Sequence, residues 1–142
     1  MAKKKAYKLD INPEYEFILI GIVSFDKDYR LCWSVNKELG LKLVKTDNLE
    51  IANDKYPEPQ KFSVYNYYNE DSMIDYNFIS NKCEYGFLIE ELKNIDYFLQ
   101  VSGEFADNFK QDIINMLKRT EGVSTVFDID PNSLKSREKL VF

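Results

Sequence analysis

The alternation of strand and helix patterns between positions 95 and 129 constrains the fold of this 142-residue chain most strongly. Residues 95–101 have the composition of an apolar strand, and residues 123–129 alternate between apolar and polar side chains like a second one. Between them, residues 104–119 carry apolar side chains at the three- and four-residue spacing of one helix face: Phe105, Phe109, Ile113, Met116 and Leu117. This order predicts a right-handed crossover that joins two parallel strands.

A second strand and helix precede this unit. Residues 15–23, YEFILIGIV, are almost continuously apolar and predict a central strand that is buried on both faces. Gly21 within it indicates a bulge or a close approach of another chain segment. Residues 27–39 then predict a helix with Leu31, Val35 and Leu39 in its buried row, and Gly40 suits the helix end.

The remaining segments are shorter. Residues 7–11 and 41–44 predict strands, residues 62–79 a hairpin, and residues 132–142 one or two helical turns with a tail. Residues 46–60 are polar and contain two prolines, which predicts an irregular, mobile loop. We therefore expect a single α+β domain over residues 1–142, with one mixed, mostly antiparallel sheet and two helices packed on one face. Residues 1–5 are expected to form a flexible basic tail.

Composition limits the chemistry that this chain can carry out. It contains no histidine, which is the commonest general base and the commonest metal ligand. It has no glycine-rich phosphate loop, and its two isolated cysteines, Cys32 and Cys83, make no zinc site. We therefore expect no catalytic residue, cofactor or bound metal, and predict that the protein is not an enzyme.

Charge and hydropathy bear on partners and location. A net charge of −5 disfavours non-specific binding to nucleic acid. The longest apolar run, residues 17–23, is far too short to cross a bilayer. The residues after the three lysines at positions 3–5 are too polar for a secretory signal. We expect a cytoplasmic protein that binds another protein, with RNA as a less favoured partner and no membrane contact.

One group of candidate binding residues lies on the predicted first helix: Tyr29, Arg30 and Trp33. The two aromatic side chains are four residues apart, and packing in the core is favoured for them over an exposed hot spot. Three tyrosines at positions 65, 67 and 68 pose a similar choice between sheet packing and a stacking platform, and packing is again favoured.

Residues 89–97, IEELKNIDY, resemble the motif I-P-E-x-x-x-V-D-Y that names a family of small bacterial proteins, the IPExxxVDY family. Ile89, Glu91, Asp96 and Tyr97 match the motif, whereas glutamate stands for its proline at position 90 and isoleucine for its valine at position 95. The similarity extends over most of the chain, through residues 19–22, 28–33, 36–37, 62–65 and 80–82. The family has no established activity. Its genes often lie near those for ribonuclease III, fatty-acid synthesis and pyruvate kinase, which implies a partner in RNA processing or lipid synthesis.

The second group of candidate binding residues lies in this motif: Glu91, Asp96 and Tyr97. We expect them to serve the fold before any partner. The Asp96 carboxylate is placed to accept a backbone N–H where the charged segment meets the strand, and the Tyr97 ring to be buried with its hydroxyl at a polar edge.

Three functions follow as hypotheses. The leading one is a non-enzymatic protein-interaction or regulatory module, because catalytic residue patterns are missing and ten tyrosines and ten phenylalanines are present. The alternative is an accessory factor of RNA processing or the ribosome that uses local lysines such as Lys42, Lys45 and Lys55. The third is a carboxylate-metal enzyme at Asp128 and Asp130, although this pair fits a solvated turn better.

Overall fold

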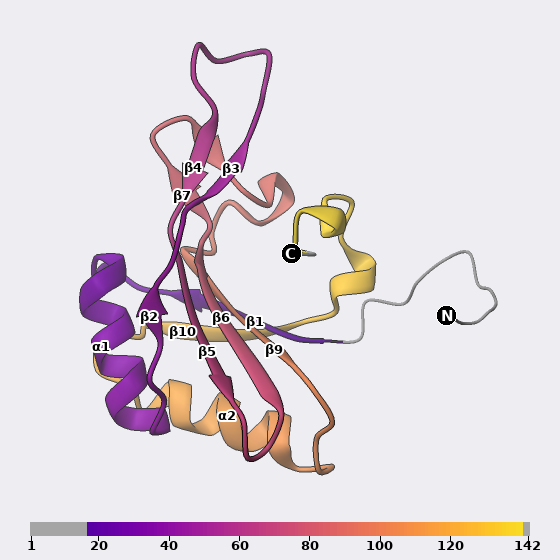
Figure 1. Cartoon of the computed structure of the whole chain (residues 1–142). Helices are drawn as coiled ribbons and strands as arrows, with labels where there is room; N and C mark the ends of the chain where they lie inside the picture. Colours follow the sequence, from indigo (N-terminus) through magenta and orange to yellow (C-terminus); the bar gives the residue numbers. More distant parts are fainter. Residues whose placement is uncertain (1–16, 141–142) are drawn as a thin grey trace, which may run out of the picture.

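The computed structural model describes residues 17–140. Its main sheet has six strands in the order β10-β1-β9-β6-β5-β2, and each neighbouring pair is antiparallel (Figure 1). The predicted α+β class with one main sheet is confirmed. The strands of the main sheet are β1 (Ile18–Val23), β2 (Val44–Lys45), β5 (Val64–Asn69), β6 (Ile74–Ser80), β9 (Tyr97–Ser102) and β10 (Thr125–Ile129).

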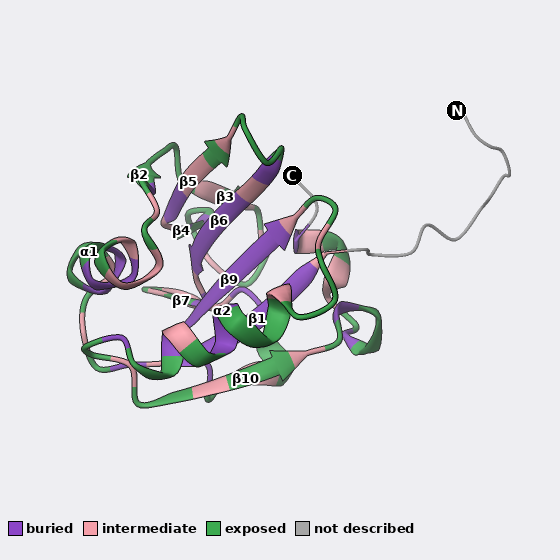
Figure 2. Ribbon diagram, turned by 90° about the horizontal axis from the view of Figure 1, so that it is seen from below, coloured by how far each residue is buried: buried purple, intermediate pink, exposed green. Residues whose placement is uncertain are grey.

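Strand β1 is a buried interior strand between β10 and β9, as its apolar sequence predicts. Figure 2 shows that burial is concentrated in β1, β6 and β9, whereas the edge strand β10 is largely exposed. Gly21 of β1 marks a close approach, because a Cβ atom there would lie 2.8 Å from the Ile129 side chain and 3.0 Å from that of Ile95.

The predicted crossover is present in modified form. Strands β9 and β10 are each antiparallel to β1, so they run parallel to one another. Helix α2 (Phe109–Lys118) connects them, and β1 occupies the place between them. The helix begins five residues later than expected. Residues 104–108 form an extended stretch and a turn, in which Phe105 stacks against Phe109 at 4.8 Å between ring centres.

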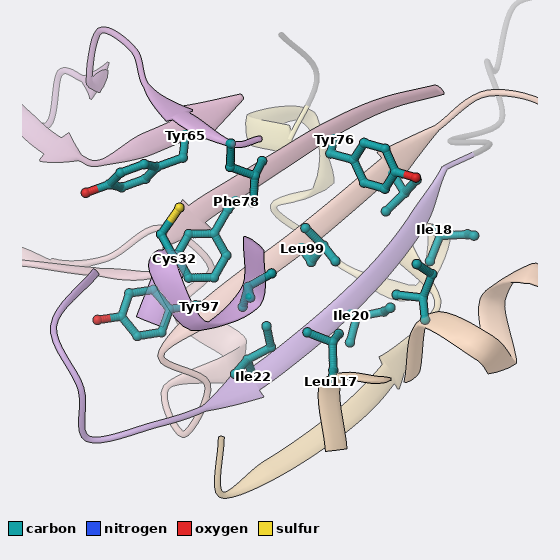
Figure 3. Packing of buried hydrophobic residues seen from close by; sticks show 14 of the residues in the cluster. Ile18, Ile20, Ile22, Cys32, Tyr65, Tyr76, Phe78, Tyr97, Leu99 and Leu117 are labelled. Atoms are coloured by element: carbon teal, nitrogen blue, oxygen red, sulfur yellow. The ribbon is translucent and has the colours of Figure 1, made fainter. Parts of the chain in front are cut away.

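Both helices pack on one face of the sheet, as predicted. Helix α1 (Asp28–Leu39) contributes Leu31, Cys32 and Val35 to this core, and α2 contributes Ile113, Ile114 and Leu117. The sheet contributes alternate residues, because successive side chains of a strand point to opposite faces. Figure 3 shows part of this core, including Cys32 and Leu117, with the Tyr97 ring beside Phe78 and Cys32.

Irregular segments cover the other face of the sheet. Residues 81–96 and the C-terminal segment pack there, with Leu88, Ile89, Leu134 and Leu140 buried. Their short elements are β7 (Lys82–Cys83), β8 (Gly86–Phe87) and the 3-10 turns η1 (Glu90–Leu92), η2 (Pro131–Ser133) and η3 (Arg137–Leu140). Within residues 17–140, no helix has the length and apolar character needed to span a bilayer.

Several predicted boundaries need correction. Residues 46–60 are not irregular throughout, because β3 (Leu49–Ile51) pairs with β4 (Gln60–Phe62), and the prolines lie in the loop between these strands. The predicted hairpin consists of β5 and β6 and begins at Val64. The predicted strand at 41–44 is reduced to β2. The expected strand at residues 7–11 and the basic tail at residues 1–5 lie outside the described residues.

Candidate binding face on helix α1

The outer side of helix α1 displays large aromatic side chains. Tyr29 and Trp33 are 64% and 56% exposed, and Phe25, just before the helix, is 98% exposed. Tyr29 and Trp33 each lie two positions before a residue of the buried row, Leu31 and Val35, which is about 200° around a helix. The prediction that these rings pack in the core is therefore wrong. Aromatic character alone does not decide burial, because the buried stripe is already filled by other residues.

We call Phe25, Tyr29 and Trp33 the aromatic row. They follow one another at four-residue spacing. The third predicted residue of this group, Arg30, is also exposed, and its Nη2 lies 3.5 Å from Glu121 Oε2. Tyr29, Arg30 and Trp33 lie within about 100° of one another around the helix axis and thus share its exposed side.

The end of α1 is fixed by local hydrogen bonds. Gly40 adopts a left-handed conformation with φ 69°, and its N–H donates to the Asn36 carbonyl. The Asn36 side chain accepts from the Leu43 N–H at 2.9 Å and donates to the Leu43 carbonyl at 3.1 Å. These contacts tie the helix end to the segment that leads into β2.

The motif residues Asp96 and Tyr97 hold the backbone on both sides of Phe25. Asp96 Oδ2 accepts the Ser24 N–H at 2.9 Å, and the Tyr97 hydroxyl donates to the Asp26 carbonyl at 2.7 Å. Ser24 Oγ also accepts the Asp26 N–H at 3.0 Å. Phe25 is thus exposed on a backbone that is held in place, rather than on an unrestrained loop.

Asp96 and Tyr97 occupy the positions that the sequence predicted. Tyr97 is 8% exposed, and its ring stacks on Phe78 with 5.1 Å between ring centres. Asp96 is half-buried and forms an ion pair with Lys82 through Oδ1. Both residues therefore support the aromatic row from beneath and do not belong to its exposed surface.

Glu91 lies elsewhere and contacts the C-terminal segment. Its Oε2 accepts the backbone N–H groups of Lys135 at 2.6 Å and Ser136 at 3.2 Å, and its Oε1 accepts the Ser136 hydroxyl at 3.0 Å. Partial burial acts to raise the pKa of Glu91, but hydrogen bonds from its own backbone, Ser136 and Lys135 outweigh it and lower the pKa. The six predicted residues therefore do not form one site.

Asn81 is a structural residue that sequence reasoning missed. It is fully buried, and its amide nitrogen donates to the carbonyls of Leu92 and Ile95, both at 2.9 Å. Its Oδ1 accepts the Ile89 N–H at 2.8 Å. One side chain thus fixes the loop that carries the motif. One sequence feature could have pointed to Asn81: residues 80–82, SNK, are among the segments that resemble the IPExxxVDY family.

Titratable groups beneath the aromatic row are poor nucleophiles. Burial and then the charge of Asp28 raise the pKa of the Cys32 thiol to about 12, so it is protonated at neutral pH and unreactive. Burial and the same carboxylate also raise the pKa of Tyr65, whose hydroxyl donates to Asp28 Oδ2 at 3.2 Å. This arrangement suits binding better than covalent chemistry.

The tyrosines at positions 65, 67 and 68 do not form a shared platform. Tyr65 is buried against Phe78, and Tyr67 stacks on Tyr76 at 5.9 Å between ring centres. Tyr68 is 47% exposed. Packing is therefore confirmed for the first two residues, while the third remains a single exposed ring.

The carboxylates at the end of β10 have other partners. Asp128 Oδ2 lies 3.0 Å from the Lys110 ammonium, and Asp130 Oδ1 accepts the Asn132 N–H at 3.0 Å. Cavities of about 350 and 280 Å³ adjoin these residues. Among residues 17–140, no three histidine, cysteine or acidic side chains are grouped to hold a metal ion.

The largest of the described cavities lies on the other face of the sheet. It measures about 400 Å³ and is bounded by residues 46–49 together with Val64, Asn66 and Asn77. Asn66, Asn77 and Gln100 lie opposite one another on β5, β6 and β9 and are hydrogen bonded in a row. These contacts satisfy the amide groups within the fold.

This chain matches no protein-family model, no curated protein and no solved structure. Its place in the IPExxxVDY family stays a prediction. The exposed surface of helix α1 is the feature of the described residues that bears on function.

Proposed function

We propose that this protein is a cytosolic interaction module that docks another protein on the aromatic row of α1. The observation that carries the proposal is the exposure of Phe25, Tyr29 and Trp33 at regular spacing on a fixed backbone. Isolated exposed apolar residues are common, whereas Tyr29 and Trp33 are neighbours at i, i+4 on one helix face, and adjoining apolar side chains mark an interaction surface. Tryptophan and tyrosine are also the residues that most often dominate binding energy at interfaces.

The charge around this surface favours an acidic partner. Residues 27–45 contain five lysines or arginines and two acidic residues, a net charge of +3 in a chain whose total is −5. Opposite charges on two proteins speed their encounter and suppress incorrect pairings. The two cysteines form no disulfide, which supports a reducing location such as the cytosol.

The test is affinity purification of the tagged full-length protein from its own host, followed by cross-linking to map contacts. Recurrent partners should be lost with Tyr29→Ala and Trp33→Ala, each of which we expect to weaken binding about 30-fold, as hot-spot truncations do. Tyr68→Ala is the matched control, because Tyr68 is an exposed tyrosine on β5. Partners that bind all four proteins equally, or the absence of any recurrent partner, would contradict the proposal.

The second candidate is an accessory role in RNA metabolism. Exposed Lys42 and Lys45 follow the helix that carries the exposed rings, and stacking beside positive charge is how single-stranded RNA is held. Filter binding of a single-stranded RNA at low salt tests this role. Retention that falls with rising salt and with Trp33→Ala would favour RNA, whereas no retention at low salt would remove direct contact with it.

A further inference from the structure

A small cleft adjoins Trp33 at the junction of α1 and the end of α2. It has a volume of about 110 Å³ and is lined by Trp33, Ser34, Lys37, Glu38, Arg119 and Glu121. A water molecule takes up about 30 Å³ of liquid, so the cleft has room for a group of roughly three or four atoms. It therefore fits the end of one side chain and not a larger ligand.

Ser34 is the unusual member of this lining. It is 4% exposed, and among buried side-chain oxygen and nitrogen atoms of the described residues its hydroxyl alone has no hydrogen-bond partner. Buried polar groups are nearly always paired, so the Ser34 hydroxyl, whose oxygen is itself buried beside the cleft, has an unused hydrogen bond. A serine hydroxyl turns between staggered rotamers, which lets it meet a group that enters the cleft.

One positively charged side chain of the cleft has no ion-pair partner among the described residues. Arg119 Nε lies 3.4 Å from Glu38 Oε2, and the Glu121 carboxylate is paired with Arg30. Lys37 instead places its ammonium 5.3 Å from the centre of the Trp33 ring. It forms no ion pair with any acidic side chain of residues 17–140. The cleft thus offers one free positive charge and one free hydroxyl.

We infer that this cleft receives the carboxylate of an aspartate or glutamate side chain from the protein that docks on the aromatic row. The Ser34 hydroxyl donates a hydrogen bond to one carboxylate oxygen, and the Lys37 ammonium donates to the carboxylate from the Trp33 side. Hydrogen bonds to an ionised group are the stronger kind, so this contact adds specificity to the apolar docking. The inference depends on the proposed function, because Trp33 belongs to both surfaces.

The experiment is selection of a displayed random heptapeptide library on the full-length protein. Trp33 is the only tryptophan of the chain, so its fluorescence reports the affinity of each selected peptide directly. Selected peptides are expected to carry aspartate or glutamate next to an apolar residue. Exchange of that acid for its amide should weaken binding about tenfold.

Variants of the cleft provide the decisive comparison. Ser34→Ala and Lys37→Gln should each lower the affinity for acidic peptides several-fold and leave the affinity for their amide versions unchanged. Lys93→Gln is the matched control, because Lys93 also places its ammonium over a ring, that of Phe87, on another part of the fold. Ser34→Ala is expected to keep or raise the urea midpoint, which separates lost binding from lost folding.

The other outcomes distinguish the two proposals. Peptides that need Tyr29 but show no acid preference, and that bind Ser34→Ala and Lys37→Gln normally, overturn the carboxylate site and leave the docking face intact. Failure to enrich any peptide, or peptides that bind Tyr29→Ala as well as the wild type, overturns both.

Discussion

Tyr97 links the hydrophobic core to the proposed docking face through a single side chain. Its ring stacks on Phe78 in the core, and its hydroxyl donates to the Asp26 carbonyl beside Phe25. Asp96, its neighbour, holds Ser24 on the other side. Asp96 and Tyr97 therefore hold the backbone on either side of Phe25, whose side chain is exposed.

This arrangement predicts unequal costs for the two motif residues. Tyr97→Ala should lose about 3–5 kcal/mol of unfolding free energy, because it truncates a buried aromatic ring. Asp96→Asn should lose about 1–3 kcal/mol, because its carboxylate accepts a backbone N–H and pairs with Lys82. Urea unfolding measures both losses. Tyr97→Phe, which keeps the ring, is the control and should lose only about 1 kcal/mol. Wild-type midpoints in both test variants would contradict this reading and make the motif a binding site.

The 3-10 turn η1 serves as an attachment point for the C-terminal segment. Glu91 in this turn binds the N–H groups of Lys135 and Ser136, while Lys139 donates to the Leu88 carbonyl at 3.0 Å. Asn81 fixes the same loop from inside. Together these contacts place two irregular segments over the sheet face that α1 and α2 do not cover.

Glu91→Gln should loosen the C-terminal segment without unfolding the domain. Three donors of Lys135 and Ser136 bind the two acceptor oxygens of the Glu91 carboxylate, and an amide keeps only one such oxygen. Amide hydrogen exchange at positions 135 and 136 should therefore accelerate about five- to thirtyfold. Lowering the pH should loosen the C-terminal segment in the same way. The pKa of Glu91 is lowered in the fold, so its contribution is present above the ordinary value of 4.5 and is lost as the pH falls through the folded value. Unchanged exchange in Glu91→Gln would show that the segment is held by its buried leucines alone.

Helical spacing predicted the face of each helix that meets the sheet, because one periodic stripe determines it. Leu31, Val35, Ile113 and Leu117 are buried as predicted, whereas Leu39, Phe109 and Met116 are only partly buried and Ile114 was missed. The same reasoning misplaced Tyr29 and Trp33, since their spacing is equally helical and their apolar area suggested the core. The pairing of β3 with β4 was missed for another reason. Each strand is only three residues long, and a proline-containing loop separates them, so no local sequence pattern predicts their pairing.

The sheet as a unit was predictable from its strands, but the layer on its other face was not. Residues 81–96 and 131–140 have no periodicity, and their positions depend on single polar contacts such as those of Asn81 and Glu91. Ser34 and Lys37 could not be recognised as a cleft either. They meet Arg119 and Glu121 only when α1 packs against the end of α2, and these two pairs of residues are more than eighty positions apart in the sequence.

The core beneath the docking face predicts that the folded state is sensitive to alkali. Burial, followed by the charges of Asp28, Asp96 and Asp26, raises the pKa of Tyr97 from 10.0 to about 12, and the pKa of Cys32 is raised from 9.0 to about 12. Both groups are neutral when protonated, and the unfolded chain releases their protons at lower pH than the folded chain does. Their protonated forms therefore contribute fully below the ordinary values, and this stability is lost as the pH rises through about 12.

We expect the urea midpoint to be constant between pH 7 and roughly 8.5 and to fall steadily from about pH 9 upward. Cys32→Ala should start from a lower midpoint, because it removes a buried side chain, but its loss between pH 8 and 10 should be smaller than that of the wild type. Tyr97→Phe should retain the wild-type slope in that interval and fall less steeply than the wild type only above pH 10, where the tyrosine begins to titrate in the unfolded chain; Tyr65 and Tyr76 still titrate there. If all three proteins lose stability in parallel from pH 8 to 11, the alkaline response does not come from Cys32 and Tyr97 and belongs to Tyr65 and Tyr76, whose pKa values burial also raises.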